Sequence, residues 1–81
     1  MLLSTAWQSY YNDKIIEGYS LITLKAYLVQ ANLLIIHFGD IAIDQITTDE
    51  LKQYLAKVAA TLKPASLAHR VRFIKSLFRW A

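Results

Sequence analysis

The chain of 81 residues contains no cysteine, two glycines and one proline. Without cysteine it has neither a disulfide framework nor a thiolate metal site, and its two histidines are too few to form an imidazole site alone. Because glycine and proline supply many turns, their scarcity argues against a loop-rich or disordered chain. Hydrophobic residues make up 56% of the sequence, enough to bury a core, so we expect one compact helical domain over residues 1–81.

Motifs of the common enzyme classes are also missing. The sequence holds no G-x-x-x-x-G-K-[ST], G-x-G-x-x-G, G-x-S-x-G or H-E-x-x-H. We therefore expect neither catalytic residues nor a cofactor in this chain. His37, Asp40 and Asp44 form a conceivable metal cluster, but acidic residues in a loop after a helix are usually solvated. The favoured interpretation of His37 is an interaction with the negative end of its helix dipole, and we expect no metal.

No segment has the form of a signal peptide or a membrane span. The start of the chain lacks a basic region and a cleavage site of small residues. The longest uninterrupted apolar run, Leu33–Ile36, is far shorter than the ~20 residues that cross a bilayer. We expect a soluble protein without a membrane partner.

Apolar spacing and punctuation predict two helices in the first half of the chain. The first helix extends from about Leu3 to Ile16 and is closed by Gly18. Ser20 is a natural N-cap for the second helix, which is expected to end near Phe38 before a glycine. The expected apolar stripe of the second helix consists of Leu21, Leu24, Leu28, Ala31 and Ile35.

Two more helices are predicted in the second half. Thr47 and Glu50 form a capping box that starts a helix over about residues 48–60. Pro64 suits the first turn of the fourth helix, which continues to the end of the chain. This helix has no Gly, Asn or Pro to end it, as expected in a piece of a longer polypeptide. Only the segment between the second and third helices resembles a short strand.

Charge is distributed unevenly. Residues 40–50 contain four acids and no base, whereas residues 62–81 contain five bases and no acid. At ~100° per residue, the fourth helix has an apolar arc and a basic one. The apolar arc contains Leu67, Val71, Ile74, Leu77, Phe78 and Ala81. The outer arc contains Ala68, His69, Arg72, Lys75, Ser76 and Arg79, with Arg70 at the edge of the apolar arc. By charge alone, contact with phosphates and a solvated basic face are equally supported.

The second helix carries a second apolar strip, opposite its main stripe, formed by Ile22, Val29, Leu33 and Ile36. The favoured interpretation is a central helix packed on two sides. The alternative is a docking strip for another domain or protomer. Near the start of this helix, Ser20, Thr23 and Lys25 place hydroxyls and a cation where a phosphate group can bind, although Ser20 is first a cap.

Three segments together resemble a known family. They are G-Y-S-x-x-T-x-x-x-Y over Gly18–Tyr27, I-T-x-x-x-L over Ile46–Leu51, and P-A-S-L-A-H-R-V-R-F-I-K-S-L-F-R-W-A over Pro64–Ala81. In order and spacing they resemble the N-terminal core-binding domain, the SAM-like helical module, of tyrosine recombinases such as phage integrases and Xer proteins. The resemblance extends from about Trp7 to Ala81 and implies an all-α, compact four-helix bundle.

The resemblance also implies a function. In this family the core-binding domain is half of a clamp around the recombination site, and its second and fourth helices approach the major groove. A separate C-terminal domain carries the nucleophilic tyrosine, so the five tyrosines of this chain are expected to be core or interface aromatics. The implied partners are double-stranded DNA, the catalytic domain of the same chain and neighbouring recombinase protomers, in the cytoplasm of a bacterium or of a phage-infected cell.

The implied DNA-facing residues lie on the second and fourth helices. The resemblance assigns Ser20, Thr23, Lys25, Ser66, His69, Arg70 and Lys75 to this set. Arg72 is added on charge, and Arg79 with less support. Lys25, Arg72 and Lys75 are expected to neutralise phosphates, whereas His69 and Arg70 are better suited to base edges. The competing hypothesis is a protein-interaction module that docks a partner helix on the second apolar strip, with a basic face that only solubilises it.

Overall fold

In a computed structural model that describes residues 1–81, helix α1 (Leu3–Ile16) is followed by helix α2 (Leu21–Phe38). Gly18 ends α1 with a φ of +90°, a left-handed conformation that glycine adopts without a steric penalty. Ser20 then caps α2, because its hydroxyl oxygen accepts a hydrogen bond of 3.2 Å from the Thr23 amide. Both helices have the predicted bounds.

Helix α3 (Thr48–Ala59) and helix α4 (Pro64–Trp80) complete the chain. The capping box at the start of α3 is present in both directions between Thr47 and Glu50, each hydrogen bond measuring 3.1 Å. Pro64 occupies the first turn of α4, where a missing amide hydrogen costs nothing. The predicted end of α3 is displaced by one residue, and the prediction of α4 is confirmed.

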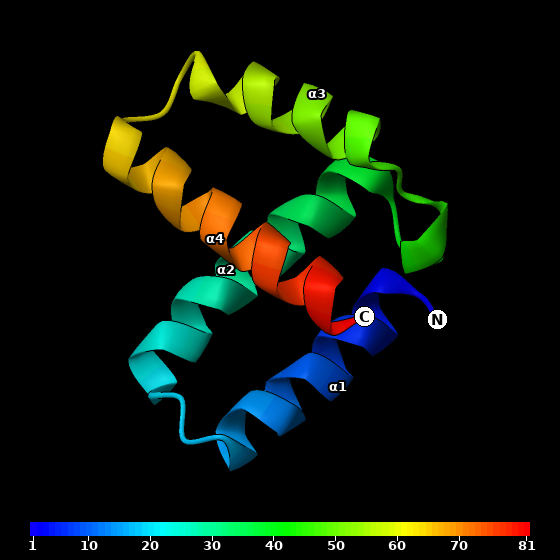
Figure 1. Ribbon diagram of the computed structural model, residues 1–81, viewed down its shortest axis with the longest axis vertical. Helices are drawn as coiled ribbons and strands as arrows, with labels where there is room; N and C mark the ends of the chain where they lie inside the picture. Colours follow the sequence, from blue (N-terminus) through cyan, green and yellow to red (C-terminus); the bar gives the residue numbers. More distant parts are fainter.

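The four helices are arranged around a crossing of α2 and α4. In Figure 1, α4 (orange to red) passes in front of α2 (cyan to green), while α1 (blue) and α3 (yellow-green) lie on either side of the crossing. Contacts of α1 with α2, of α3 with α4, and of both α1 and α2 with α4 hold this arrangement. The expected all-α fold with four helices is confirmed.

The core is aromatic at its centre. Phe73 of α4 and Tyr10 of α1 are fully buried, and their rings meet edge to face at a centroid distance of 6.1 Å. Burial raises the pKa of Tyr10, although a 2.7 Å hydrogen bond with the Ser76 hydroxyl acts in the opposite direction. Phe73 was absent from the predicted apolar arc of α4, and its burial shows that the buried face is rotated toward it.

The buried stripe of α2 also differs from the predicted one. The residues of α2 that reach the core are Leu24, Tyr27, Ala31 and Leu34. Leu21 and Leu28, which were predicted to be buried, are 63% and 41% exposed. The prediction failed because α2 is apolar around most of its circumference, so that periodicity alone does not locate the side facing α1 and α4.

The connection between α2 and α3 holds the beginning of α1. It contains a short 3₁₀ turn, Ile43–Gln45, and no strand; one isolated antiparallel bridge joins Leu2 to Ala42. The Asp40 carboxylate accepts hydrogen bonds from the Ser4 amide (2.9 Å) and hydroxyl (2.6 Å). Asp40 therefore caps α1, which has no capping side chain of its own.

We expect this cap to make stability depend on pH. The two hydrogen bonds from Ser4, through the hydroxyl first and the amide second, lower the pKa of Asp40 below its ordinary value of 3.8. A lowered pKa stabilises the fold above about pH 4, and this stabilisation is lost as the pH falls through the folded-state value. Asp40→Asn is expected to lower the midpoint of urea unfolding at pH 7, with the difference from wild type disappearing near pH 2. An equal effect of Asp44→Asn, whose carboxylate makes no hydrogen bond, would contradict this role.

Candidate nucleic-acid interface

The basic arc of α4 is exposed as predicted for its charged members. Arg72, Lys75 and Arg79 are all exposed, lie within about 60° of one another around the helix axis and form no ion pair. We call these three residues the basic ridge. No acidic residue occurs on α4, so the positive charge of the ridge is not compensated on its own helix.

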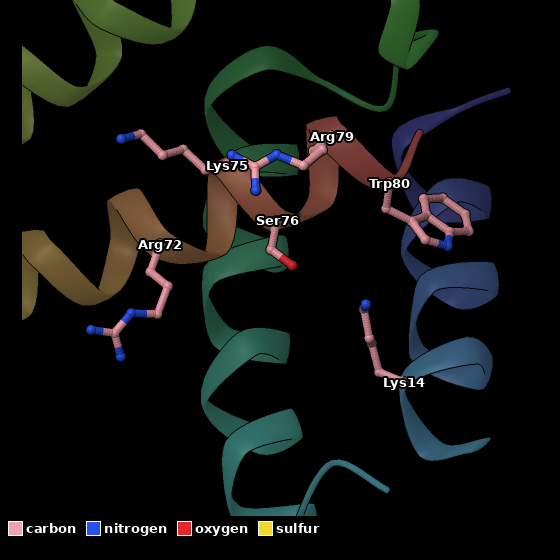
Figure 2. Close-up of a pocket in the computed structure, with 6 residues that line it drawn as sticks. All are labelled: Lys14, Arg72, Lys75, Ser76, Arg79 and Trp80. Carbon is pink, nitrogen blue, oxygen red and sulfur yellow. The ribbon is translucent and has the colours of Figure 1, made fainter. Parts of the chain in front are cut away.

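A hollow beside the ridge adds a cation from α1. The hollow has a volume of about 460 Å³, and Figure 2 shows Lys14 reaching toward it from α1 while Arg72 and Arg79 border it from α4. Its lining residues are Lys14, Arg72, Lys75, Ser76, Arg79 and Trp80. Four of these six are cationic and none is acidic, so the hollow is suited to an anion.

Lys14 was not identified from the sequence, because nothing local indicates that the end of α1 lies beside the end of α4. Its ammonium forms an ion pair of 3.2 Å with Glu17. Burial lowers the pKa of Lys14, but the hydrogen bond to Glu17 and the nearby Tyr19 hydroxyl raise it, and the net pKa is above its ordinary value. Lys14 is therefore cationic at neutral pH, with part of its charge offset by Glu17.

Two residues assigned to the outer arc of α4 are turned inward. Ser76 is half-buried and its hydroxyl is engaged with Tyr10. His69 is half-buried against the ring of Tyr27, at a centroid distance of 5.5 Å. Both lie on the side of α4 that faces α1 and α2. The helical wheel misplaced them because the buried arc of α4 is centred closer to Phe73 than the apolar pattern suggests.

A second hollow lies where the beginning of α4 passes the middle of α2. It has a volume of about 410 Å³, and its lining residues are Gln30, Leu62, Ala65, Ser66, His69 and Arg70. Three buried polar atoms on these residues have no hydrogen-bond partner: Gln30 Oε1, His69 Nε2 and Arg70 Nε. An unsatisfied buried polar atom costs about 1–3 kcal/mol, so this hollow favours a polar occupant. Gln30 was not among the predicted site residues; its only signal was an amide within an apolar helix.

Arg70 is anchored to α3. Its Nη1 donates a hydrogen bond of 3.1 Å to the Tyr54 hydroxyl, and its guanidinium lies 5.9 Å from the centroid of the Tyr54 ring. Arg70 is half-buried, as its position at the edge of the apolar arc indicated. A full bidentate contact with a base would therefore compete with Tyr54 for the guanidinium.

The predicted residues at the beginning of α2 are separate from both hollows. The Ser20 hydroxyl donates to the Thr23 hydroxyl (2.9 Å) and accepts from the Thr23 amide, so it acts as a cap. Lys25 is exposed and forms no ion pair. It lies on the side of α2 away from the buried stripe, and the structure does not bring it together with the residues of α4.

The second apolar strip of α2 is not packed. Ile22, Val29 and Ile36 are 83%, 55% and 78% exposed, and Leu33 is half-buried. The interpretation that α2 is packed on two sides is wrong, because α1 and α4 cover a single side and the described chain has no element over the other. Helix α2 is also long and apolar enough to span a membrane by length and composition, with a mean hydropathy of 1.5.

Neither histidine belongs to a metal-binding group. No cluster of three or more His, Cys, Asp or Glu side chains occurs in residues 1–81. His37 is exposed and its ring lies 4.6 Å from those of Phe38 and Tyr54. Tyr54, like Tyr10 and Tyr27, is buried in the core, whereas Tyr19 is 37% exposed.

Comparison with known protein families assigns the fold. A sequence model of one family, described as phage integrase, N-terminal SAM-like domain, matches residues 7–81. These residues include all four helices except the first turn of α1. No curated protein and no solved structure matches the chain. The match spans the same residues as the resemblance found in the sequence and confirms it, with a likeness to Xer proteins remaining a prediction. The chain therefore belongs to the family of phage integrase N-terminal SAM-like domains.

Proposed function

We propose that this chain is the DNA-binding domain of a site-specific tyrosine recombinase and that it holds the recombination site while a separate catalytic domain of the same protein cuts and rejoins the strands. Membership of the integrase family supports the recombinase assignment. The basic ridge and the hollow beside it are the observation that carries the proposal, because four cations from two helices converge there without an acid in the lining.

The ridge and the hollow suit the DNA backbone. Arg72, Lys75 and Arg79 are exposed on one side of α4, and Lys14 extends the positive surface to α1. Contacts of this kind neutralise phosphates, release counterions and position a protein on the duplex without selecting a sequence. Lys25 would add a further phosphate contact from the other side of α2.

The hollow at the beginning of α4 suits base edges. Ser66 is exposed there, and the partnerless atoms include an acceptor, Gln30 Oε1, and a donor, Arg70 Nε. Each base pair presents donors and acceptors in the major groove, which suit a hollow lined by polar groups. We propose that Ser66 and His69 contact bases, with Arg70 held in place by Tyr54.

A titration of the ¹⁵N-labelled domain with short duplex DNA tests this function. At about 50 mM salt we expect amide shifts at Lys14, Arg72, Lys75 and Arg79 that decrease strongly at about 200 mM. Shifts at Ser66 and His69 should instead change with the sequence of the duplex. An unchanged spectrum at both salt concentrations would contradict DNA binding, since the label also reports that the domain is folded.

The exposed strip of α2 favours the second candidate function, a protein-interaction module. In that case DNA would leave the spectrum unchanged, whereas increasing protein concentration would shift the amide signals of Ile22, Val29 and Ile36. The basic ridge and the exposed strip lie on different sides of the domain, with only Lys25 beside the strip, so the same labelled sample distinguishes the two functions.

A further inference from the structure

The exposed side of α2 has the spacing of a helix-pairing seam. Its apolar residues follow one another at intervals of four, three, four and three, and they are Ile22, Ala26, Val29, Leu33 and Ile36. They lie within about 80° around the helix axis, roughly opposite the buried stripe. Intervals of three and four are those of a coiled-coil seam, which packs against a second helix at a shallow angle.

We propose that this seam pairs with the same seam of a second copy of the chain, with the two α2 helices antiparallel and the twofold axis at Val29. This proposal does not depend on DNA binding. In such a pair Ile22 of one copy faces Ile36 of the other, because both lie seven residues from Val29. Ala26 of one copy faces the region of Leu33 of the other, so that a small side chain meets a large one.

The charges of α2 permit this arrangement. The helix contains no acidic residue, and Lys25 is its only lysine or arginine. In the antiparallel pair the two copies of Lys25 are eight residues apart along the axis, about 12 Å at 1.5 Å per residue, where salt screens most of their repulsion. A foreign acidic helix would find one cation beside the seam, whereas a second copy needs no complementary charge.

The exposed side chains also favour pairing. Ile22, Val29 and Ile36 are exposed by more than half, and β-branched residues have few rotamers to lose when they are buried. The seam is about 21 Å long, which corresponds to a small interface of the kind found in weak complexes. We therefore expect self-association at high protein concentration. The basic ridge stays open, because the seam faces away from α1 and α4.

Sedimentation of the domain over about 20 µM to 1 mM, without DNA, tests the pairing. We expect the mass to rise from 9.3 kDa toward twice that value. Val29→Glu should lower the association constant on the order of a hundredfold or more, because the two new carboxylates meet on the axis. Ile16→Glu is the matched control, because Ile16 is 83% exposed but lies at the end of α1, outside the seam. Its replacement should leave the association constant equal to that of wild type.

Mixing two variants tests the symmetry. Val29→Glu and Val29→Lys should each remain monomeric, whereas their equimolar mixture should form a heterodimer through the opposite charges at position 29. Circular dichroism and the DNA titration check that each variant is folded and that its ridge is intact, so a failure of pairing is separable from a failure of DNA binding.

Three results would overturn the proposal. The first is a wild-type domain that stays monomeric up to 1 mM, and the second is a dimer that Val29→Glu does not weaken. The third is binding of the monomer to phosphatidylcholine vesicles that is lost in Val29→Glu, which would assign the strip to a lipid surface, as the hydropathy of α2 also allows.

Discussion

Arg72→Ala combined with Arg79→Ala is expected to weaken binding of duplex DNA on the order of a hundredfold at about 50 mM salt. Both residues are exposed on the basic ridge and line the hollow that Lys14 completes, and neither contributes to the core. Each lost phosphate contact lowers the salt slope by about 0.9, so the slope should fall by about 1.8. The difference in affinity should accordingly decrease to about eightfold at about 200 mM. Fluorescence anisotropy with a labelled duplex gives both quantities.

The control for this variant removes the same charge elsewhere. Lys52→Ala combined with Lys57→Ala also lowers the net charge from +3 to +1, but both lysines are exposed on α3. If the ridge binds DNA, this control should weaken binding only slightly. Equal losses in the two double variants would show that the overall charge attracts DNA without a specific surface, and the proposed interface would be wrong.

Phe73→Ala is expected to destabilise the domain by about 3–5 kcal/mol, the usual cost of removing a buried phenyl ring. Phe73 is fully buried, and its ring has aromatic neighbours from two other helices: Trp7 and Tyr10 of α1 and Tyr27 of α2, at centroid distances of 5.0–6.1 Å. A domain of this length has a total stability of roughly 4–12 kcal/mol. The melting temperature should therefore fall by about 12–40 °C, or the variant should be unfolded at 25 °C. Urea and thermal unfolding followed by circular dichroism measure the change.

Phe78→Ala provides the comparison on the same helix. Phe78 is half-buried and packs at the edge of the core, so its replacement should cost clearly less than that of Phe73. Equal losses at the two positions would mean that the buried face of α4 is not centred on Phe73. The DNA affinity of Phe78→Ala should stay close to that of wild type, since Phe78 lines neither the basic hollow nor the one at the beginning of α4.

Local sequence was sufficient to predict the helices. Ser20 and the capping box of Thr47 with Glu50 bind amides three residues away, and the fixed φ of Pro64 suits a first helical turn. These effects do not depend on the rest of the chain. Gly18 and Gly39 end their helices through positive φ values of the same local kind. The charge of the ridge was likewise visible in the sequence, because three cations without an acid on one side of a helix follow from periodicity alone.

The tertiary structure decided which side of each helix is buried. On α2, where apolar residues occur on almost every side, only the positions of α1 and α4 select Leu24, Tyr27, Ala31 and Leu34 for the core. The same contacts turn His69 and Ser76 inward and leave Ile22, Val29 and Ile36 exposed. Lys14 joins Arg72 and Arg79 only because the end of α1 lies beside the end of α4, and Asp40 caps a helix that begins 37 residues earlier at Leu3. Periodicity and capping act over a few residues, whereas these arrangements depend on how whole helices pack. For this reason the sequence alone determined where the helices begin and end, and only the tertiary structure decided which surfaces are exposed.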